Sequence, residues 1–157
     1  MTRPPRLSTL PLVQGDLWVT GDRGADHLVN TDPMALLVGM LLDQQVRLEV
    51  AFAGPAKLHR RLGHLDPARL AALPEDELVT VACTPPAIHR YSAVMARRVQ
   101  ALARAVVDEY AGRPERIWEE ARNAADLKRR LLALPVFGEE KAMITIAVLA
   151  KRFGIRP

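Results

Sequence analysis

The stretch LPVFGEEKA, residues 134–142, joins two segments of helical periodicity through a turn that contains one proline and one glycine. Proline fixes one backbone angle, glycine permits a tight or left-handed backbone, and the next helix begins with free N–H groups. Such a turn can hold a phosphate oxygen without any side chain. A plain turn between two packed helices would show the same spacing, so the rest of the chain must decide between the two.

Apolar residues recur at helical spacing along most of the chain, which predicts a mostly α protein. A single strand is expected at LWVTGD, residues 17–22, so residues 1–31 should form an N-terminal segment with at most that strand. Residues 32–157 should form one helical domain, in which Gly54-Pro55 bends or divides the second helix. The expected helices are 33–42, 47–61, 67–72, 75–82, 87–110, 115–122, 125–133 and 139–153.

Composition sets limits on the class of protein. With 157 residues, of which 49% are hydrophobic, the chain can bury one sizeable core. Its single cysteine, Cys83, excludes an internal disulfide and a four-thiolate iron–sulfur cluster, and no metal site is expected. A reducing, cytoplasmic compartment and a monomer fit best. Apolar runs are too short to cross a bilayer, and Pro11 breaks the one near the N-terminus.

Positive charge is concentrated in the second half of the sequence. Residues 1–83 carry 8 lysines and arginines against 10 acidic residues, whereas residues 84–157 carry 14 against 8. This asymmetry points to a side of the molecule that faces a polyanion, although an ordinary solvated basic surface explains it equally well. Arg90, Arg97 and Arg104 recur every seven residues and should share one helix face, with Arg90 in the first turn, where the helix dipole attracts anions.

Three motifs in the chain resemble, in order, those of the helix-hairpin-helix (HhH-GPD) superfamily of base-excision DNA glycosylases. LPVFGEEKA is similar to the family's Leu-Pro-Gly-x-Gly hairpin, and DPMALLVGMLLDQQ (32–45) looks like its opening helix with a terminal glutamine. PPAIHRYSAVMARRVQALARAVVDEY (85–110) looks like the helix between them. The resemblance covers about residues 32–154 and is strongest to a bacterial branch, related to endonuclease III, whose members often have no assigned substrate.

The resemblance implies a helical bundle of two lobes, formed by one interrupted chain, with double-stranded and damaged DNA across the cleft. Gln45, with Gln44 as a second candidate, takes the place of the side chain that fills the gap left by a flipped nucleotide. Gly138 and the N–H groups of Glu139 to Lys141 match the phosphate-gripping turn. Such backbone contacts position DNA without reading its sequence.

Four further residues are candidates for contact with DNA. His89 lies one position off the apolar stripe of the 87–110 helix, where it is expected to contact phosphate or act as an acid near neutral pH. Arg90 and Arg97 are expected on the DNA side. Tyr91 fits the core stripe, so burial is expected for it rather than stacking on a base.

The hairpin departs from the family pattern at two positions. Val136 replaces the first glycine, so the turn must use ordinary backbone angles or accept strain. Glu140 occupies the position of the lysine that forms a Schiff base in bifunctional members. Lys141 is one residue further, about 100° around the helix, and we expect it to contact phosphate rather than attack the sugar.

The family's catalytic aspartate would lie beyond the hairpin's second helix, and here no acidic residue follows Glu140 before Pro157. A truncated gene, an inactive DNA binder or a different catalytic acid each explains this, and Asp43 is the substitute nearest the expected cleft. We expect a glycosylase-like enzyme that flips a damaged base and hydrolyses its N-glycosidic bond. A catalytically inactive helix-hairpin-helix binder of DNA structure is the alternative, and a helical protein–protein adaptor is a weaker third.

Overall fold

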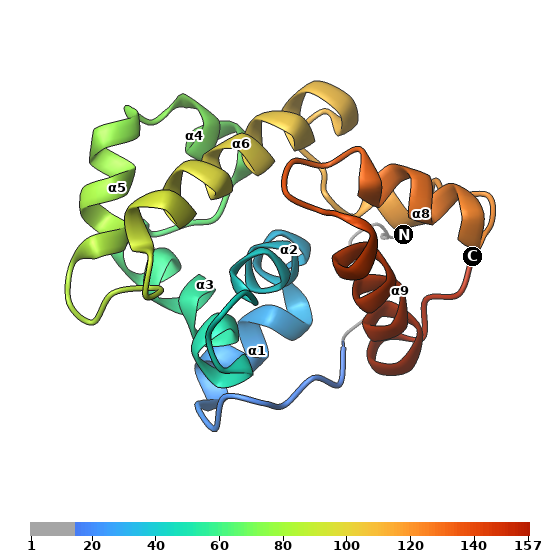
Figure 1. Cartoon of the computed structure of the whole chain (residues 1–157), viewed down its shortest axis with the longest axis horizontal. Helices are drawn as coiled ribbons and strands as arrows, with labels where there is room; N and C mark the ends of the chain where they lie inside the picture. Colours follow the sequence, from blue (N-terminus) through green and yellow to red (C-terminus); the bar gives the residue numbers. More distant parts are fainter. Residues whose placement is uncertain (1–14) are drawn as a thin grey trace, which may run out of the picture.

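The computed structural model describes residues 15–157, and this part of the chain is helical without any strand, which confirms the mostly α fold class (Figure 1). Sequence-based expectations for residues 1–14 lie outside the described residues. The helices are α1 (Arg23–Thr31), α2 (Pro33–Leu42), α3 (Leu48–Leu62), α4 (Pro67–Ala72), α5 (Glu75–Cys83), α6 (Ser92–Tyr110), α7 (Arg116–Glu119), α8 (Ala124–Leu132) and α9 (Glu139–Phe153).

Helix α2 is the centre of the molecule, as its apolar sequence predicts. Every residue from Met34 to Leu42 is buried, and α1, α3 and α6 pack around the helix. Asp32 caps the helix by accepting hydrogen bonds from the N–H groups of Met34 and Ala35, and Pro33 fits the first helical position. A helix that is apolar on all sides has to be covered on all sides. The end of α2 therefore fixes where the residues after it can reach the surface.

Helix α3 runs from Leu48 to Leu62 with Pro55 inside it, so of the bend or division expected at Gly54-Pro55 the division does not occur. Gly54 lets this helix approach α2 closely, because a Cβ atom there would lie 2.3 Å from Leu42 Cδ1. The glycine is therefore explained by packing between helices rather than by a turn.

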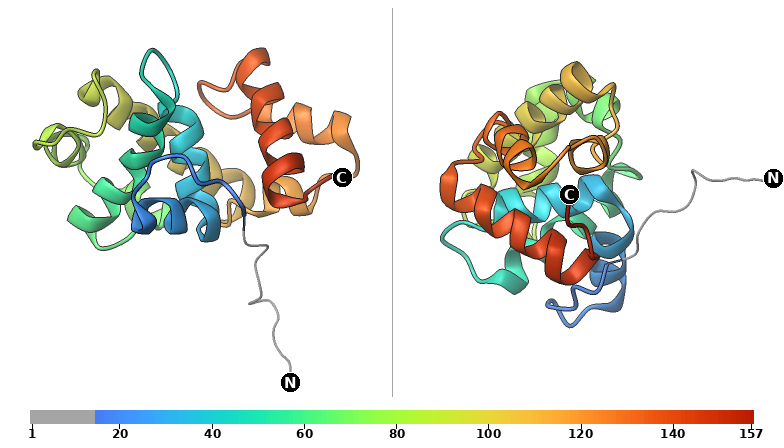
Figure 2. Two further views of the ribbon diagram at one scale, coloured as in Figure 1. Left: turned by 90° about the horizontal axis from the view of Figure 1, so that it is seen from below. Right: turned by 90° about the vertical axis from the view of Figure 1, so that its right-hand side faces the viewer.

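The helices form two groups, which correspond to the predicted lobes (Figures 1 and 2). Helices α1 to α6 form one group, and α7 to α9 form the other. The first described residues contact the second group, because the N–H of Asp16 donates a hydrogen bond to Arg152 O of α9 at 2.7 Å. Buried residues of both groups belong to one continuous core. The lobes are therefore built from one interrupted chain and are not independent units.

The strand expected at residues 17–22 does not form, because two side chains of α1 satisfy its backbone instead. Asn30 accepts a hydrogen bond from Leu17 N–H at 2.8 Å and donates one to Leu17 O at 3.0 Å. Asp26 accepts from the N–H groups of Val19 and Thr20. Helix α1 itself was not predicted, although Asp22 caps it.

Helix α6 begins at Ser92, five residues later than predicted, because side chains complete the turn before it. Tyr91 N–H donates to His89 Nδ1, and Ser92 Oγ accepts from His89 N–H and donates to His89 O. These local bonds compete with the helical ladder. Tyr91 consequently lies outside the core stripe with 45% of its surface exposed, so the expectation that it is buried was wrong.

Neither a metal cluster nor a membrane span is found from Gly15 onward. No group of three or more His, Cys, Asp or Glu side chains in this region could hold a metal ion. No helix here combines the length and apolar character needed to cross a bilayer.

Candidate nucleic-acid interface

A cleft of about 630 Å³ lies between the C-terminal end of α2 and the start of α9. It brings together residues from distant parts of the sequence, and six of the predicted site residues line it. The full lining consists of Asp43, Gln44, Gln45, Val136, Gly138, Glu139, Glu140, Lys141 and Ile144. The cleft is open, mixed in polarity and walled by a helix end on each side, as a site for an extended ligand requires.

The hairpin turn at Leu134–Phe137 has the geometry of a type II turn. Phe137 N–H donates to Leu134 O at 3.3 Å, Pro135 occupies the second position, and Val136 in the third position has φ +69°. Leu134 and Phe137 are buried and anchor the turn on the core. Glycine is the residue that suits the third position of this turn, so the backbone of Val136 is strained, which is one of the two outcomes expected from the sequence.

Gly138 places the start of α9 at the wall of the cleft. Its backbone is extended, with φ −80° and ψ −173°, and it caps the helix without a side-chain hydrogen bond. The first intrahelical bond runs from Ala142 N–H to Gly138 O, which leaves the N–H groups of residues 139–141 available to a ligand. A Cβ atom on Gly138 would meet no protein atom within 4 Å. Glycine is thus not required by the fold here, and what it keeps open is the approach to these donors.

Glu139 and Glu140 place two carboxylates in the first turn of α9, where an anionic ligand would compete with them. Glu139 forms an ion pair with Lys128 of α8 at 2.5 Å, which offsets its charge and ties the two helices of the hairpin together. Glu140 is exposed and lines the cleft at the position that a lysine takes in bifunctional relatives. The side chain of Glu139 therefore connects α9 with α8, and its backbone N–H remains available to a ligand.

The two adjacent glutamines differ in their surroundings. Gln44 is fully engaged: its amide donates to Leu41 O at 3.0 Å and accepts from Arg98 Nη1 at 2.8 Å. Gln45 is exposed, has φ +57°, and makes no side-chain hydrogen bond to residues 15–157. Of the pair that the sequence left unresolved, only Gln45 has an amide available to a ligand.

Lys141 does not point outward as a phosphate contact would. Its Nζ donates to Met40 O at 2.5 Å and to Asp43 O at 3.2 Å, so the ammonium group closes the C-terminal end of α2. A cation is favourable there because the helix dipole is negative at that end. Burial lowers the pKa of Lys141, while Asp43 and Glu140 act in the opposite direction. The ammonium group is thus used within the protein, and the phosphate contact expected for this side chain stays a prediction.

His89 is also a supporting residue and not a surface ligand. It is only 4% exposed, and its Nδ1 accepts a hydrogen bond from Tyr91 N–H. The hydrogen is therefore on Nε2, which donates to Gln44 O at 3.0 Å. The expectation that His89 reaches phosphate directly was wrong, because the late start of α6 turns the ring into the protein.

The three arginines at seven-residue spacing do not share one helix face. Arg90 lies in the turn before α6, exposed and 6.0 Å from the Tyr91 ring centroid. Arg97 forms an ion pair with Glu75 of α5 at 3.1 Å, and Arg104 is exposed further along α6. None of them lines the cleft. The residue on α6 that does contact the site is Arg98, which the sequence analysis missed because its partner Gln44 lies 54 residues away.

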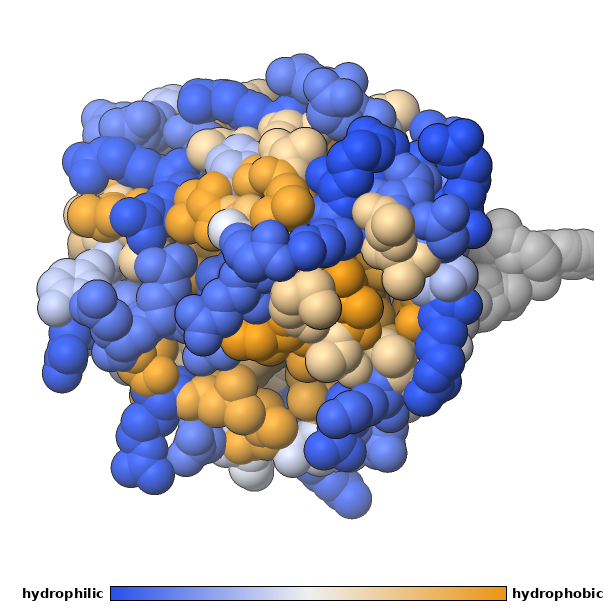
Figure 3. All heavy atoms as spheres, turned by 45° about the vertical axis from the view of Figure 1, so that its right-hand side comes forward, coloured by the Kyte–Doolittle hydropathy of each residue, from blue (hydrophilic) through white to orange (hydrophobic). Residues whose placement is uncertain are grey.

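Gln45 separates the cleft from a second, smaller hollow. This groove of about 190 Å³ is lined by Gln44, Gln45, Tyr91, Val94, Met95 and Arg98. Tyr91 and Val94 are exposed at its edge. Figure 3 shows apolar side chains gathered between hydrophilic ones on one face of the molecule. The amide of Gln45 therefore lines both hollows.

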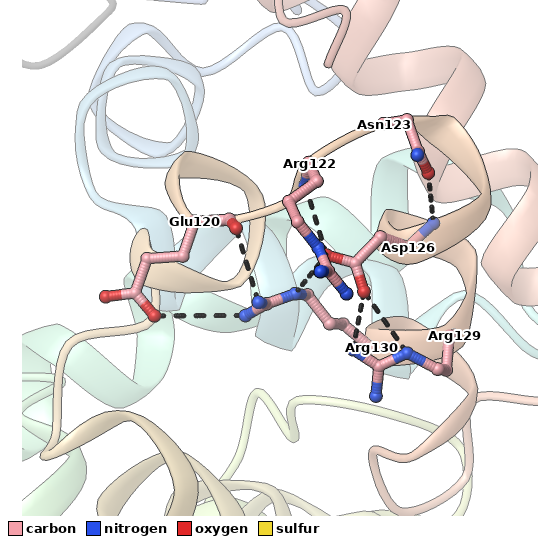
Figure 4. Close-up of polar contacts among 6 residues, drawn as sticks. All are labelled: Glu120, Arg122, Asn123, Asp126, Arg129 and Arg130. Carbon is pink, nitrogen blue, oxygen red and sulfur yellow. Dashed lines mark hydrogen bonds and ion pairs between the residues drawn. The ribbon is translucent and has the colours of Figure 1, made fainter.

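An ionic network supports α8, the helix that precedes the hairpin turn (Figure 4). The buried Asp126 carboxylate accepts hydrogen bonds from Arg122 N–H and from the guanidinium groups of Arg129 and Arg130. These bonds, that from the Arg122 backbone first, hold the pKa of Asp126 well below its usual range. Asn123 caps α8 by accepting from Asp126 N–H at 2.8 Å. The network fixes the corner between α7 and α8, and thereby the helix that leads into the turn.

A helical protein with a hairpin at one wall of a cleft, open N–H groups and a facing amide has the architecture of a phosphate-gripping DNA repair domain. Residues 38–152 match the family described as "HhH-GPD superfamily base excision DNA repair protein". The chain belongs to this family. No curated protein matches it.

Two solved structures are similar in fold. One is described as "Structure of a non-covalent Endonuclease III-DNA Complex", with a TM-score of 0.56 and 24% identity, over 81% of this chain and 50% of that one. The other is "Structure of a Trapped Endonuclease III-DNA Covalent Intermediate: Estranged-Adenine Complex", with a TM-score of 0.53 and 23% identity, over 78% and 48%. The chain spans about half the length of these structures, and at this identity the likeness concerns the fold.

Proposed function

We propose that this protein binds double-stranded DNA across the cleft and acts in base-excision repair as a glycosylase on a damaged base. The observation that carries the proposal is the pairing of open N–H groups beyond Gly138 with the unengaged amide of Gln45 on the opposite wall. Membership of the HhH-GPD family and the fold shared with DNA-bound endonuclease III support it. We further propose that the protein acts as a monomer and without an iron–sulfur cluster.

The phosphate grip would come from the backbone. The N–H groups of Glu139, Glu140 and Lys141 lie at the positive end of the α9 dipole, which favours a phosphate oxygen. The extended backbone at Gly138, with no Cβ in the way, lets the phosphodiester come close. Because Glu139 is paired with Lys128, one of the two nearby carboxylates opposes the ligand less strongly.

Gln45 would enter the duplex at the site of the damaged base. Its left-handed backbone and exposed side chain place the amide between the two hollows. An amide both donates and accepts hydrogen bonds, so it can replace the lost pairing partner of whichever base is left behind. Extrusion of the damaged nucleotide costs a few kcal/mol, and this contact would offset part of that.

Asp43 is the carboxylate that we propose for the chemistry. It lies at the end of α2, is half-buried and lines the cleft. Hydrolysis of an N-glycosidic bond develops positive charge on the sugar, and a carboxylate beside it lowers the energy of that state. Release of a free base from some lesion in a panel of modified duplexes is expected, and Asp43→Asn should abolish it. DNA binding without any release across a broad panel would leave the inactive binder as the correct description.

The binding proposal is tested by Gly138→Ala. The added methyl group has room in the free protein, so the stability should change by less than about 0.5 kcal/mol, whereas it blocks the approach of a phosphate to the N–H groups. Loss of one hydrogen bond to a charged group, about 1.5–3 kcal/mol, corresponds to roughly 10–100-fold weaker binding. Fluorescence anisotropy would be measured with a labelled duplex that contains one tetrahydrofuran residue, an analogue of an abasic site.

Gly24→Ala is the matched control, because this glycine also lies at a helix start, and its added Cβ makes only an ordinary contact with Asp22. It should bind DNA like the wild type. Wild-type affinity in Gly138→Ala, with its melting temperature unchanged, would rule out the phosphate grip at this turn.

A further inference from the structure

Three hydrogen bonds from three separate elements converge on the short segment 43–46, which carries Gln45, and a fourth reaches Met40 just before it. Lys141 from α9 donates to Met40 O and Asp43 O, at the end of α2 that leads into the segment. His89, in the turn before α6, donates to Gln44 O, and Arg98 from α6 donates to the Gln44 side chain. The side chain of Gln45 makes no hydrogen bond to residues 15–157, and its backbone has φ +57°.

We propose that Lys141 is a positioning residue that sets the conformation of Gln45 and couples it to the phosphate grip. The same residue contributes its backbone N–H to the open start of α9 and its ammonium group to the end of α2. A phosphate that binds at α9 therefore meets a helix whose first turn is tied to the segment that carries Gln45. Lys141 acts through Gln45 and touches neither the base nor the sugar.

The geometry separates this role from two others that a lysine in a DNA cleft can have. A phosphate contact needs an ammonium group that extends into solvent, but here two donor positions are already used on buried carbonyls. A nucleophile must reach the sugar, whereas Nζ of Lys141 is held against Met40 O and Asp43 O at the end of α2. Met40 O lies in the last turn of α2, where it also accepts from Asp43 N–H, and Asp43 O belongs to the residue that caps this helix.

Hydrogen exchange in the free protein tests the positioning role without any DNA. Lys141→Met keeps the stem of the side chain and removes the three donors. The amides of Asp43 and Gln44, which donate to Met40 O and Leu42 O, should exchange roughly tenfold faster in this variant, as expected for the loss of a bond to a charged group. Lys151→Met removes the same charge from the exposed last turn of α9 and is the matched control. Unchanged exchange in Lys141→Met would overturn the inference.

Binding experiments then test the coupling, and for these the inference rests on the proposed DNA-binding function. The preference of the protein for a tetrahydrofuran duplex over the intact duplex should fall to near unity in Lys141→Met. The slope of affinity against salt should stay the same, because no phosphate contact is lost. Gln45→Ala should abolish the preference in the wild type and have no further effect beside Lys141→Met. Lys151→Met should leave the preference intact.

Each contrary result has a distinct meaning. A salt slope reduced by about 1 with the preference intact would make Lys141 a phosphate ligand. Covalent trapping of the wild type on abasic DNA by borohydride, lost in Lys141→Met, would make it a nucleophile, and either result overturns the positioning role. If the wild type binds no duplex at all, the proposed function fails, while the exchange rates in segment 43–46 still decide the role of Lys141 in the free protein.

Discussion

Val136 offers a quantitative test of the strain in the hairpin. Its φ of +69° lies in the left-handed region, which costs an L-residue about 1–2 kcal/mol. Glycine avoids this cost but loses about 0.5–1 kcal/mol through the greater freedom of the unfolded chain. Alanine keeps most of the strain and, like glycine, lacks the valine methyl groups. Val136→Gly should therefore be more stable than Val136→Ala by about 0.5–1 kcal/mol.

Comparison with the wild type requires one more contribution. Val136 is 37% exposed, so truncation of its side chain gives up roughly 1 kcal/mol of burial. Val136→Ala should then be less stable than the wild type by about that amount. In Val136→Gly the relief of strain offsets the loss, and its stability should lie within about 0.5 kcal/mol of the wild type.

Urea unfolding followed by far-UV circular dichroism measures these differences at a constant m-value. For a protein of this size, 1 kcal/mol corresponds to about 2–4 °C in the melting temperature, so a thermal scan gives a second reading. If Val136→Ala proves as stable as Val136→Gly, the left-handed backbone carries no strain and the reasoning is refuted.

Two carboxylates, the buried Asp126 and the half-buried Asp32, should respond to pH in opposite directions. The pKa of Asp126 is lowered in the folded protein by its bonds to Arg122 and Arg129, so it stabilises the fold above the unfolded pKa of about 3.9, and this contribution is lost as pH falls. Urea unfolding of Asp126→Asn should show a deficit near pH 7 that shrinks on acidification, and a deficit independent of pH would contradict this. Burial raises the pKa of Asp32, so stability falls as pH rises from about 3.9 through the folded value. Asp32→Asn keeps the cap and should be at least as stable as the wild type at pH 7, whereas Asp32→Ala loses about 1 kcal/mol; equal losses in both variants would rule out the charge as the cause.

Local patterns in the sequence were sufficient to predict the framework. Helix α2 follows from Asp32-Pro33 and an unbroken apolar run, and the hairpin follows from its proline and glycine. Both features depend on neighbours in sequence, so periodicity and capping rules are enough to find them. The cleft, by contrast, was implied only by the resemblance of the three ordered motifs to the HhH-GPD superfamily.

Side-chain directions at the site were not predictable in the same way. Lys141 bonds to a carbonyl 101 residues away, and the partners of His89 and Arg98 are 45 and 54 residues away. Whether a lysine at a helix start extends into solvent or turns inward depends on which carbonyls the fold brings beside it. Gln44 and Gln45 are the same residue type in adjacent positions. Only the contacts of Gln44 with distant residues distinguish its surroundings from those of Gln45.

The hairpin also shows that its two glycine positions meet different physical demands. The first, where Val136 stands, requires a left-handed backbone, and a side chain there costs stability. The second, Gly138, has ordinary angles and open space around it, so a side chain there costs little in the free protein and interferes only with a ligand. A fold can tolerate the loss of the first glycine because the buried Leu134 and Phe137 hold the turn in shape. No such compensation exists at the second position, where a methyl group would occupy the space of the proposed phosphate contact.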